Sequence, residues 1–132
     1  MFDVGQNDLP GAFYSQTEDK VLASTPTILS EFETGLKRLY NQGARRFWIH
    51  NTAPLGYLAQ NIAAFGKDAS KLDELGCVSA HNRAAKLFNL QLHELCTRLL
   101  GQFGDATITY VGIFSIKSNL IANYSRYDSR IL

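Results

Sequence analysis

The sequence of 132 residues lacks several features that would assign it to a class of protein at once. It has only two cysteines, Cys77 and Cys96, which are too few for a disulfide framework and stand in no Cys/His cluster of metal-ligand spacing. Cys96 lies on an amphipathic stretch, which favours a buried free thiol. The 13 basic and 12 acidic side chains nearly balance, so charge gives no argument for nucleic acid or an anionic membrane as partner. We therefore expect no metal and no nucleic acid.

The sequence also has no long hydrophobic run. Its longest uncharged stretch lies between Arg46 and Lys67 and contains His, Asn, Gln, Pro and Gly, which is not the composition of a membrane span. Met1 is followed directly by a strand-like segment, without the basic and apolar regions of a signal peptide. No signal peptide and no integral membrane segment are predicted, and the compartment stays unassigned.

The common catalytic motifs are missing too. The sequence holds no G-x-S-x-G nucleophile motif and no Gly-rich phosphate loop, and no pair of carboxylates stands out. His81 and His93 are 12 positions apart, which is not a metal-ligand spacing, and we expect both at the surface or hydrogen-bonded to a partner. The residues alone therefore prove no enzyme, and no cofactor is expected.

What the sequence does have is the composition of an ordinary globular domain, with 45% hydrophobic and 19% charged residues. Segments of β-branched and aromatic residues alternate with segments of helical periodicity. Strands are predicted at 1–5, 44–51 and 105–111, helices at 25–43, 76–101 and 115–124, and irregular structure at 51–75. This alternation predicts an α/β fold with a parallel sheet and crossover helices.

Two of the predicted helices have clear sequence signals. The first is expected to begin with Thr25 as N-cap and Pro26 at the first helical position, and to end at Gly43 in a left-handed conformation. The second carries one apolar stripe, which we expect to face the core. Its members are Val78, Ala84, Ala85, Phe88, Leu92, Leu95 and Leu99.

Ligands of parallel sheets bind beyond the carboxyl ends of the strands, so the residues after each strand are the candidates for function. Gly5 lets the backbone approach a ligand closely, and Asn7 can donate a hydrogen bond to a developing oxyanion. From the residues alone, a plain turn is the simpler interpretation of Gly5 to Asp8. His50 can be a base at a strand end, although a histidine that ties down the following loop is the simpler interpretation.

Three segments together resemble the plant GDSL esterase/lipases of the SGNH hydrolase superfamily. They are FDVGQNDL, which is similar to the third conserved block, then YNQGARRFWIHNTAPLGYLAQ, and then the stretch from Asp73 to Tyr127. In this order they cover almost the whole chain. The resemblance implies a flavodoxin-like α/β/α sandwich that hydrolyses carboxylic esters with a Ser-His-Asp triad and no metal. The resemblance also implies that the substrate is a small-molecule ester.

Carried over residue by residue, the resemblance makes Asn7 the oxyanion-hole donor and Gly5 the residue that shapes its loop. The Gly-Asp-Ser block of the family would precede Met1, and its D-x-x-H block would follow Leu132. We therefore expect residues 1–132 to be a single partial domain of about three parallel strands, without the nucleophile or the Asp/His pair and inactive as given. Its first strand would have a bare edge that favours self-association.

Two departures from the family pattern stand out. Members usually have Cys where Tyr57 stands, and if that Cys pairs with the one matching Cys77, Cys77 has no such partner here. The family's Y-V-D-I pattern reads Y-V-G-I at 110–113 in this sequence.

The alternative to an ester hydrolase is a non-catalytic, degenerate relative that binds an ester or pairs with another chain. A flavodoxin-like nucleotide-binding module is a weaker alternative, because the phosphate loop is missing. Family members are usually secreted.

Overall fold

Three parallel strands form the sheet of the computed structural model, which describes residues 1–5 and 8–123. The strands are β1 (Phe2–Asp3), β2 (Arg46–His50) and β3 (Thr107–Val111), and they lie in the order β1-β2-β3. Phe2 lies opposite Ile49, and His50 lies opposite Val111. The predicted parallel sheet is confirmed, although β1 is shorter than the sequence suggested.

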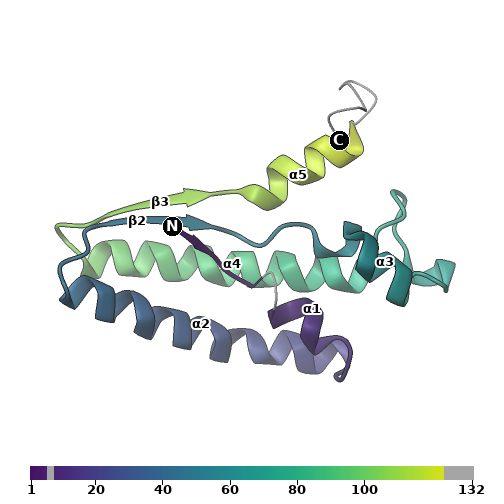
Figure 1. Ribbon diagram of the computed structural model, residues 1–132, viewed down its shortest axis with the longest axis horizontal. Helices are drawn as coiled ribbons and strands as arrows, with labels where there is room; N and C mark the ends of the chain where they lie inside the picture. The colour runs from purple at the N-terminus through teal and green to yellow at the C-terminus, as the bar shows by residue number, and fades with distance from the viewer. Residues whose placement is uncertain (6–7, 124–132) are drawn as a thin grey trace.

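The long helices α2 (Glu18–Asn41) and α4 (Ser79–Gln102) connect the strands. Figure 1 shows both helices on the same side of the sheet, running along the strands. The strand order β1-β2-β3 means that each strand pairs with the next strand along the chain, always on the same side. Two right-handed crossovers in this order place both helices on one face of the sheet. The shorter helices α1 (Asp8–Ala12), α3 (Ala59–Phe65) and α5 (Ile113–Ala122) lie toward the carboxyl ends of the strands.

The core lies between this helical layer and the sheet. Phe47 and Ile49 point into it from β2, and the predicted stripe from Ala84 to Leu99 on α4 belongs to the same buried cluster. Val78, which was predicted as part of the stripe, is buried but is the N-cap before the helix and lies outside this cluster. The Phe2 ring of β1 stands 5.7 Å from that of Phe32 on α2, which brings the first strand into the same core. Hydrophobic burial of this kind is the main source of stability for such a sheet and helix pair.

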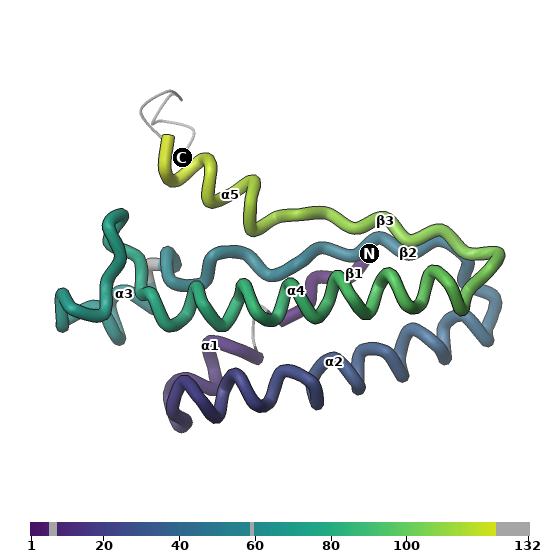
Figure 2. Tube along the Cα trace, turned by 180° about the vertical axis from the view of Figure 1, so that it is seen from behind, coloured from purple at the N-terminus to yellow at the C-terminus, as the bar shows by residue number. Residues whose placement is uncertain are grey.

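The opposite face of the sheet has no helical layer within the described residues. Trp48 is 52% exposed there and lies beside Thr109 of β3. Seen from behind in Figure 2, α5 extends past the end of β3 and does not fold back over the strands. The structure is thus an incomplete α/β fold, with a sheet and one helical layer. No helix of the described part has the length and apolar character needed to cross a membrane.

The predicted start of the first long helix is wrong. Thr25 is not an N-cap and Pro26 is not a first helical residue, because α2 begins at Glu18 and includes both. Thr17 is the N-cap, and Glu18 and Asp19 place negative charge in the first turn, where it favours the helix dipole. The end was predicted correctly, since Gly43 follows the helix with φ of +109°.

Two further expectations are corrected in the region before α4. The stretch predicted as irregular contains α3 and two short 3₁₀ turns, Leu55–Tyr57 and Ala69–Lys71. His81 is neither exposed nor hydrogen-bonded. It is buried between the rings of Phe13 and Phe65, and its Nδ1 has no partner. Burial lowers its pKa, which keeps the ring neutral among these aromatic side chains. His93 is exposed, as expected.

Candidate functional site

The loops that leave the three strands meet at the carboxyl edge of the sheet. Val4 and Gly5 follow β1, Asn51 and Thr52 follow β2, and Gly112 separates β3 from α5. A set of buried and partly buried hydrogen bonds joins them, and its donors and acceptors are all neutral. We call this set the edge network; its side chains are those of Asn51, Thr52, Asn89 and Tyr110.

Thr52 is the centre of the edge network, and it is fully buried. Its hydroxyl donates a hydrogen bond to the carbonyl oxygen of Val4. Its backbone N–H donates to Oδ1 of Asn89, and Nδ2 of Asn89 donates back to the Thr52 carbonyl, both at 2.8 Å. The side-chain amide of Asn89 thus replaces the backbone partners that a neighbouring strand would provide. It satisfies the buried N–H and carbonyl of Thr52 beyond the end of β2.

Asn51 and Tyr110 extend the network to the loop after β3. Nδ2 of Asn51 donates to the Tyr110 hydroxyl at 3.1 Å, and Oδ1 of Asn51 accepts from the backbone N–H of Phe114 at 2.9 Å. The Tyr110 hydroxyl donates to the carbonyl of Asn89 at 3.4 Å. Burial raises the pKa of Tyr110, so its hydroxyl stays protonated and can keep donating.

Gly5 is held against this network in a conformation that favours glycine. Its φ is +88°, and a Cβ at this position would overlap the Thr52 hydroxyl and stand 2.9 Å from Cε1 of Phe88. Both the backbone conformation and the lack of space therefore require glycine. Asn7, the other candidate residue, lies outside the described residues.

His50 does not take part in the edge network. Its ring lies on the uncovered face of the sheet, with its centre 5.8 Å from that of Trp48. Within the described part of the chain it is Asn51 and Thr52, rather than His50, whose side chains tie the following loop to its neighbours.

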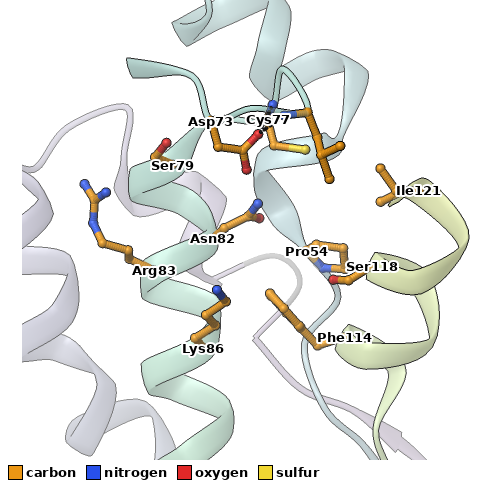
Figure 3. A pocket seen from close by; sticks show the side chains of 11 residues that line it. Pro54, Asp73, Cys77, Ser79, Asn82, Arg83, Lys86, Phe114, Ser118 and Ile121 are labelled. Atoms are coloured by element: carbon orange, nitrogen blue, oxygen red, sulfur yellow. Dashed lines mark hydrogen bonds between the residues drawn. The ribbon is translucent and has the colours of Figure 1, made fainter. Parts of the chain in front are cut away.

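A cavity of about 330 Å³ lies near the same edge, between α4, α5 and the loop before α4 (Figure 3). Pro54 and Phe114 line it with apolar surface, and Asn82 and Lys86 with polar groups. Oδ1 of Asn82 accepts a hydrogen bond from the Gly56 N–H at 2.8 Å, so this side chain braces the cavity wall.

The two cysteines offer no nucleophile. Both thiols are free and buried. Burial raises the pKa of the Cys96 thiol to about 11, and burial together with the nearby Asp73 carboxylate raises that of Cys77. Neither forms the thiolate that attack would need near neutral pH. Tyr57 and Cys77 flank the Gly56–Val78 backbone hydrogen bond, and the Tyr57 side chain is half exposed.

The edge network can hold backbone in place, and nothing in it can attack a substrate. No cluster of three or more His, Cys, Asp or Glu side chains suited to a metal occurs among residues 1–5 and 8–123. The sequence analysis missed Thr52, Asn89 and Tyr110. One signal was available for Asn89, because it is a polar residue between Ala85 and Leu92 on the apolar stripe of α4. A buried amide at such a place needs hydrogen-bond partners.

In open parallel α/β sheets ligands bind beyond the carboxyl ends of the strands, and the glycine-dependent loop after β1 lies at that edge. The sequence profile of the GDSL-like Lipase/Acylhydrolase family matches residues 1–129. The chain belongs to this family, as the resemblance predicted.

Individual relatives agree with the family. The chain is 68% identical over 127 residues to GDSL esterase/lipase At1g54790 and 63% identical to GDSL esterase/lipase At3g05180, both from Arabidopsis thaliana. It is 43% identical over 123 residues to Alpha-L-fucosidase 3 of the same plant. These alignments cover 92–96% of this chain but only 31–34% of each relative. The chain thus spans about a third of the length of these relatives.

Proposed function

We propose that this chain is the part of a GDSL-type ester hydrolase that supplies the oxyanion loop, which we define as residues 5–8. In this proposal residues 1–132 are a single partial domain. Asn7 donates a hydrogen bond to the oxyanion that forms when a carboxylic ester is attacked, and Gly5 shapes the backbone that carries Asn7. The substrate is a small-molecule ester, and no metal or cofactor takes part.

The observation that carries the proposal is the conformation of Gly5 against Thr52 and Phe88. A plain turn can use a glycine with a positive φ, but it does not need a buried hydroxyl and an aromatic ring packed where a Cβ would stand. Preorganised donors act by being fixed before charge develops, so a loop built on such a support suits an oxyanion donor. The family membership adds the reaction class.

The chain by itself should show only background hydrolysis. Its 132 residues contain neither a Gly-Asp-Ser nor a D-x-x-H motif, and an oxyanion donor without a nucleophile has no charge to stabilise. The test is hydrolysis of a short-chain p-nitrophenyl ester by the purified chain and by Asn7→Ala. Turnover that falls on Asn7→Ala would mean that a working nucleophile exists within the chain and that this part of the proposal is wrong.

The oxyanion role is tested by exchanging this chain for the matching third of GDSL esterase/lipase At1g54790, with the intact relative as positive control. We expect the chimera to hydrolyse the ester and Asn7→Ala to lower kcat about 10²–10³-fold. Asn41→Ala, at the exposed end of α2, is the matched control and should leave kcat unchanged. An active chimera that tolerates Asn7→Ala would overturn the assignment, and so would an inactive chimera beside an active relative.

A second candidate function is chain pairing through the outer edge of β1, supported by a specific observation. Within the described residues β1 pairs only with β2. Its outer side borders an apolar groove of about 500 Å³ lined by Phe2, Phe32, Leu36 and Leu39. An unpaired strand edge beside apolar surface invites another extended segment. For the isolated chain, we propose that a second copy takes this place.

Sedimentation at several concentrations tests this pairing. We expect the chain to dimerise and Phe2→Lys, which puts a charge on the edge, to remain monomeric. Trp48→Lys is the matched control, because it places the same charge on the uncovered sheet face instead. Dimers that survive Phe2→Lys but are lost in Trp48→Lys would move the interface from the edge to that face.

A further inference from the structure

We propose that Thr52 is a positioning residue for the oxyanion loop, and that Asn89 holds Thr52 in place. Its hydroxyl fixes the Val4–Gly5 backbone, from which that loop leaves β1. This inference rests on the proposed role of the loop in ester hydrolysis. It adds to that role the groups that hold the Val4–Gly5 backbone, at the start of the loop.

The Val4–Gly5 backbone is restrained from three directions. The Thr52 hydroxyl binds the Val4 carbonyl oxygen, the Leu9 N–H donates to the Gly5 carbonyl at 3.3 Å, and the Phe88 ring closes the space beside the Gly5 Cα. Of the three, the bond from Thr52 is the one that ties this backbone to the segment after β2. We expect the position of Gly5 beyond the end of β1 to depend on this hydroxyl.

Thr52 is itself immobilised, which is what a positioning residue requires. The side-chain amide of Asn89 engages both its N–H and its carbonyl at 2.8 Å. Asn89 lies in the middle of α4, whose neighbouring residues Ala85, Phe88 and Leu92 are fully buried. The hydroxyl is thus held from a fully buried part of the core, and supporting hydrogen bonds of this kind fix functional groups to within a fraction of an ångström.

The consequence for the reaction follows from the geometry of oxyanion holes. Donors act only at about 2.7–3.1 Å from the developing charge. A displacement of about 1 Å costs on the order of 10²-fold in rate. Because the charge exists only in the transition state, a displaced donor lowers kcat and leaves KM nearly unchanged.

Hydrogen exchange in the purified chain tests the positioning without any need for activity. Thr52→Val keeps the side-chain volume and removes the donor, whereas Thr52→Ser keeps the donor. We expect Thr52→Val to lower protection of the Leu9 amide about tenfold or more while the β2 amides keep theirs, as for a local opening. Thr52→Ser should restore the protection of the Leu9 amide. Equal loss across Leu9 and β2 would show a merely structural residue and overturn the proposal.

Thr25→Val is the matched control for this substitution. Thr25 is as fully buried as Thr52, but its Oγ1 has no hydrogen-bond partner. The same chemical change at Thr25 should therefore leave Leu9 protection unchanged. If Thr25→Val and Thr52→Val lower it equally, burial rather than the hydrogen bond to Val4 is responsible and the proposal fails.

Kinetics of the chimera test the effect on catalysis. We expect Thr52→Val to lower kcat about 10–100-fold with KM unchanged, and Thr52→Ser to recover most of this. In an Asn7→Ala background, Thr52→Val should lower kcat less than about threefold, because the effects of residues that act as a unit are not additive. Additive losses, or a change in KM alone, would contradict the positioning role.

The two proposals fail in different ways. If Asn7→Ala leaves the chimera fully active, or the chimera is inactive, the proposed function falls and hydrogen exchange still decides whether Thr52 positions the loop. If Asn7→Ala abolishes activity and Thr52→Val leaves both kcat and Leu9 protection intact, the proposed function stands and the inference about Thr52 is wrong.

Discussion

The two ends of the sheet are held together by different chemistry. At the carboxyl ends, the edge network is neutral, buried at Thr52 and Asn89 and partly buried at Asn51 and Tyr110, and it joins the segments after β1 and β2 to β3 and the start of α5. At the amino ends, Arg45 before β2 donates to Asp105 before β3 at 2.7 Å, with Arg45 40% and Asp105 62% exposed. The Tyr40 hydroxyl donates to the same carboxylate.

This difference matters for the proposed function, in which only the carboxyl end presents backbone to a ligand. An exposed ion pair tolerates small movements and contributes little in water. Buried hydrogen bonds leave costly unpaired groups when they break, so they hold their geometry. A rigid loop is therefore expected at the carboxyl end, and a replaceable tether at the amino end.

Gly5→Ala should have the largest effect on stability. A positive φ and overlap with Thr52 and Phe88 together should cost about 2–5 kcal/mol of unfolding free energy, measured by urea denaturation. Gly43→Ala is the matched control, because Gly43 also has a positive φ but nothing within 4 Å of its Cβ position. It should cost only about 1–2 kcal/mol. Equal losses would mean that the packing around Gly5 contributes nothing.

Asn89→Leu should come next, at about 2–4 kcal/mol, because it leaves the N–H and carbonyl of buried Thr52 unpaired. Thr25→Val, which removes a buried hydroxyl without a partner, should change the unfolding free energy by less than about 0.5 kcal/mol or stabilise the chain. Thermal or urea unfolding measures both. A small effect of Asn89→Leu would contradict the claimed difference between the two ends of the sheet.

Asp105→Asn should have the smallest effect. Hydrogen bonds from Tyr40 and Arg45 lower the pKa of Asp105 in the folded chain. The ionised carboxylate therefore contributes to folding stability above the ordinary pKa of 3.8, and this contribution is lost as pH falls through the lower folded value. The stability difference between the chain and the variant should thus shrink below pH 3.8. It should also shrink at neutral pH in about 1 M salt, where the Debye length is about 3 Å.

Glu31→Gln, a change to an exposed carboxyl of α2 with no ion pair within the described residues, serves as the control for Asp105→Asn. It removes a negative charge without touching the amino-end cluster. A pH dependence that is the same in both variants would mean that the Asp105 contacts contribute nothing of their own.

The sequence predicted the sheet well and its edge poorly, for a physical reason. Apolar periodicity is local, so the stripe of α4 and the β2 and β3 segments could be located from neighbouring residues alone. The edge network joins Val4, Thr52 and Asn89, whose partners are far apart along the chain. The start of α2 was misplaced for another reason, since Thr25-Pro26 carries a strong start signal that the core-facing Val21 overrides.

Of the candidate site, the sequence predicted Gly5 but not what holds it, and Asn7 stays a prediction outside the described residues. Gly5 was chosen because glycine at a strand end allows close approach, and the structure shows the approach to be to Thr52 and Phe88. Which polar side chain meets a buried backbone group depends on the packing of α4 against β2. A single sequence without that packing cannot supply it.

The Asn89–Thr52 pair also sets where the chain can change in length. Shifting α4 by a single residue would move Asn89 about 1.5 Å along the helix axis and break both of its 2.8 Å bonds. Insertions or deletions between β2 and α4 must therefore be absorbed before the helix begins. The segment from α3 to the 3₁₀ turn Ala69–Lys71 projects from the end of the sheet, and we expect such variation to be tolerated there.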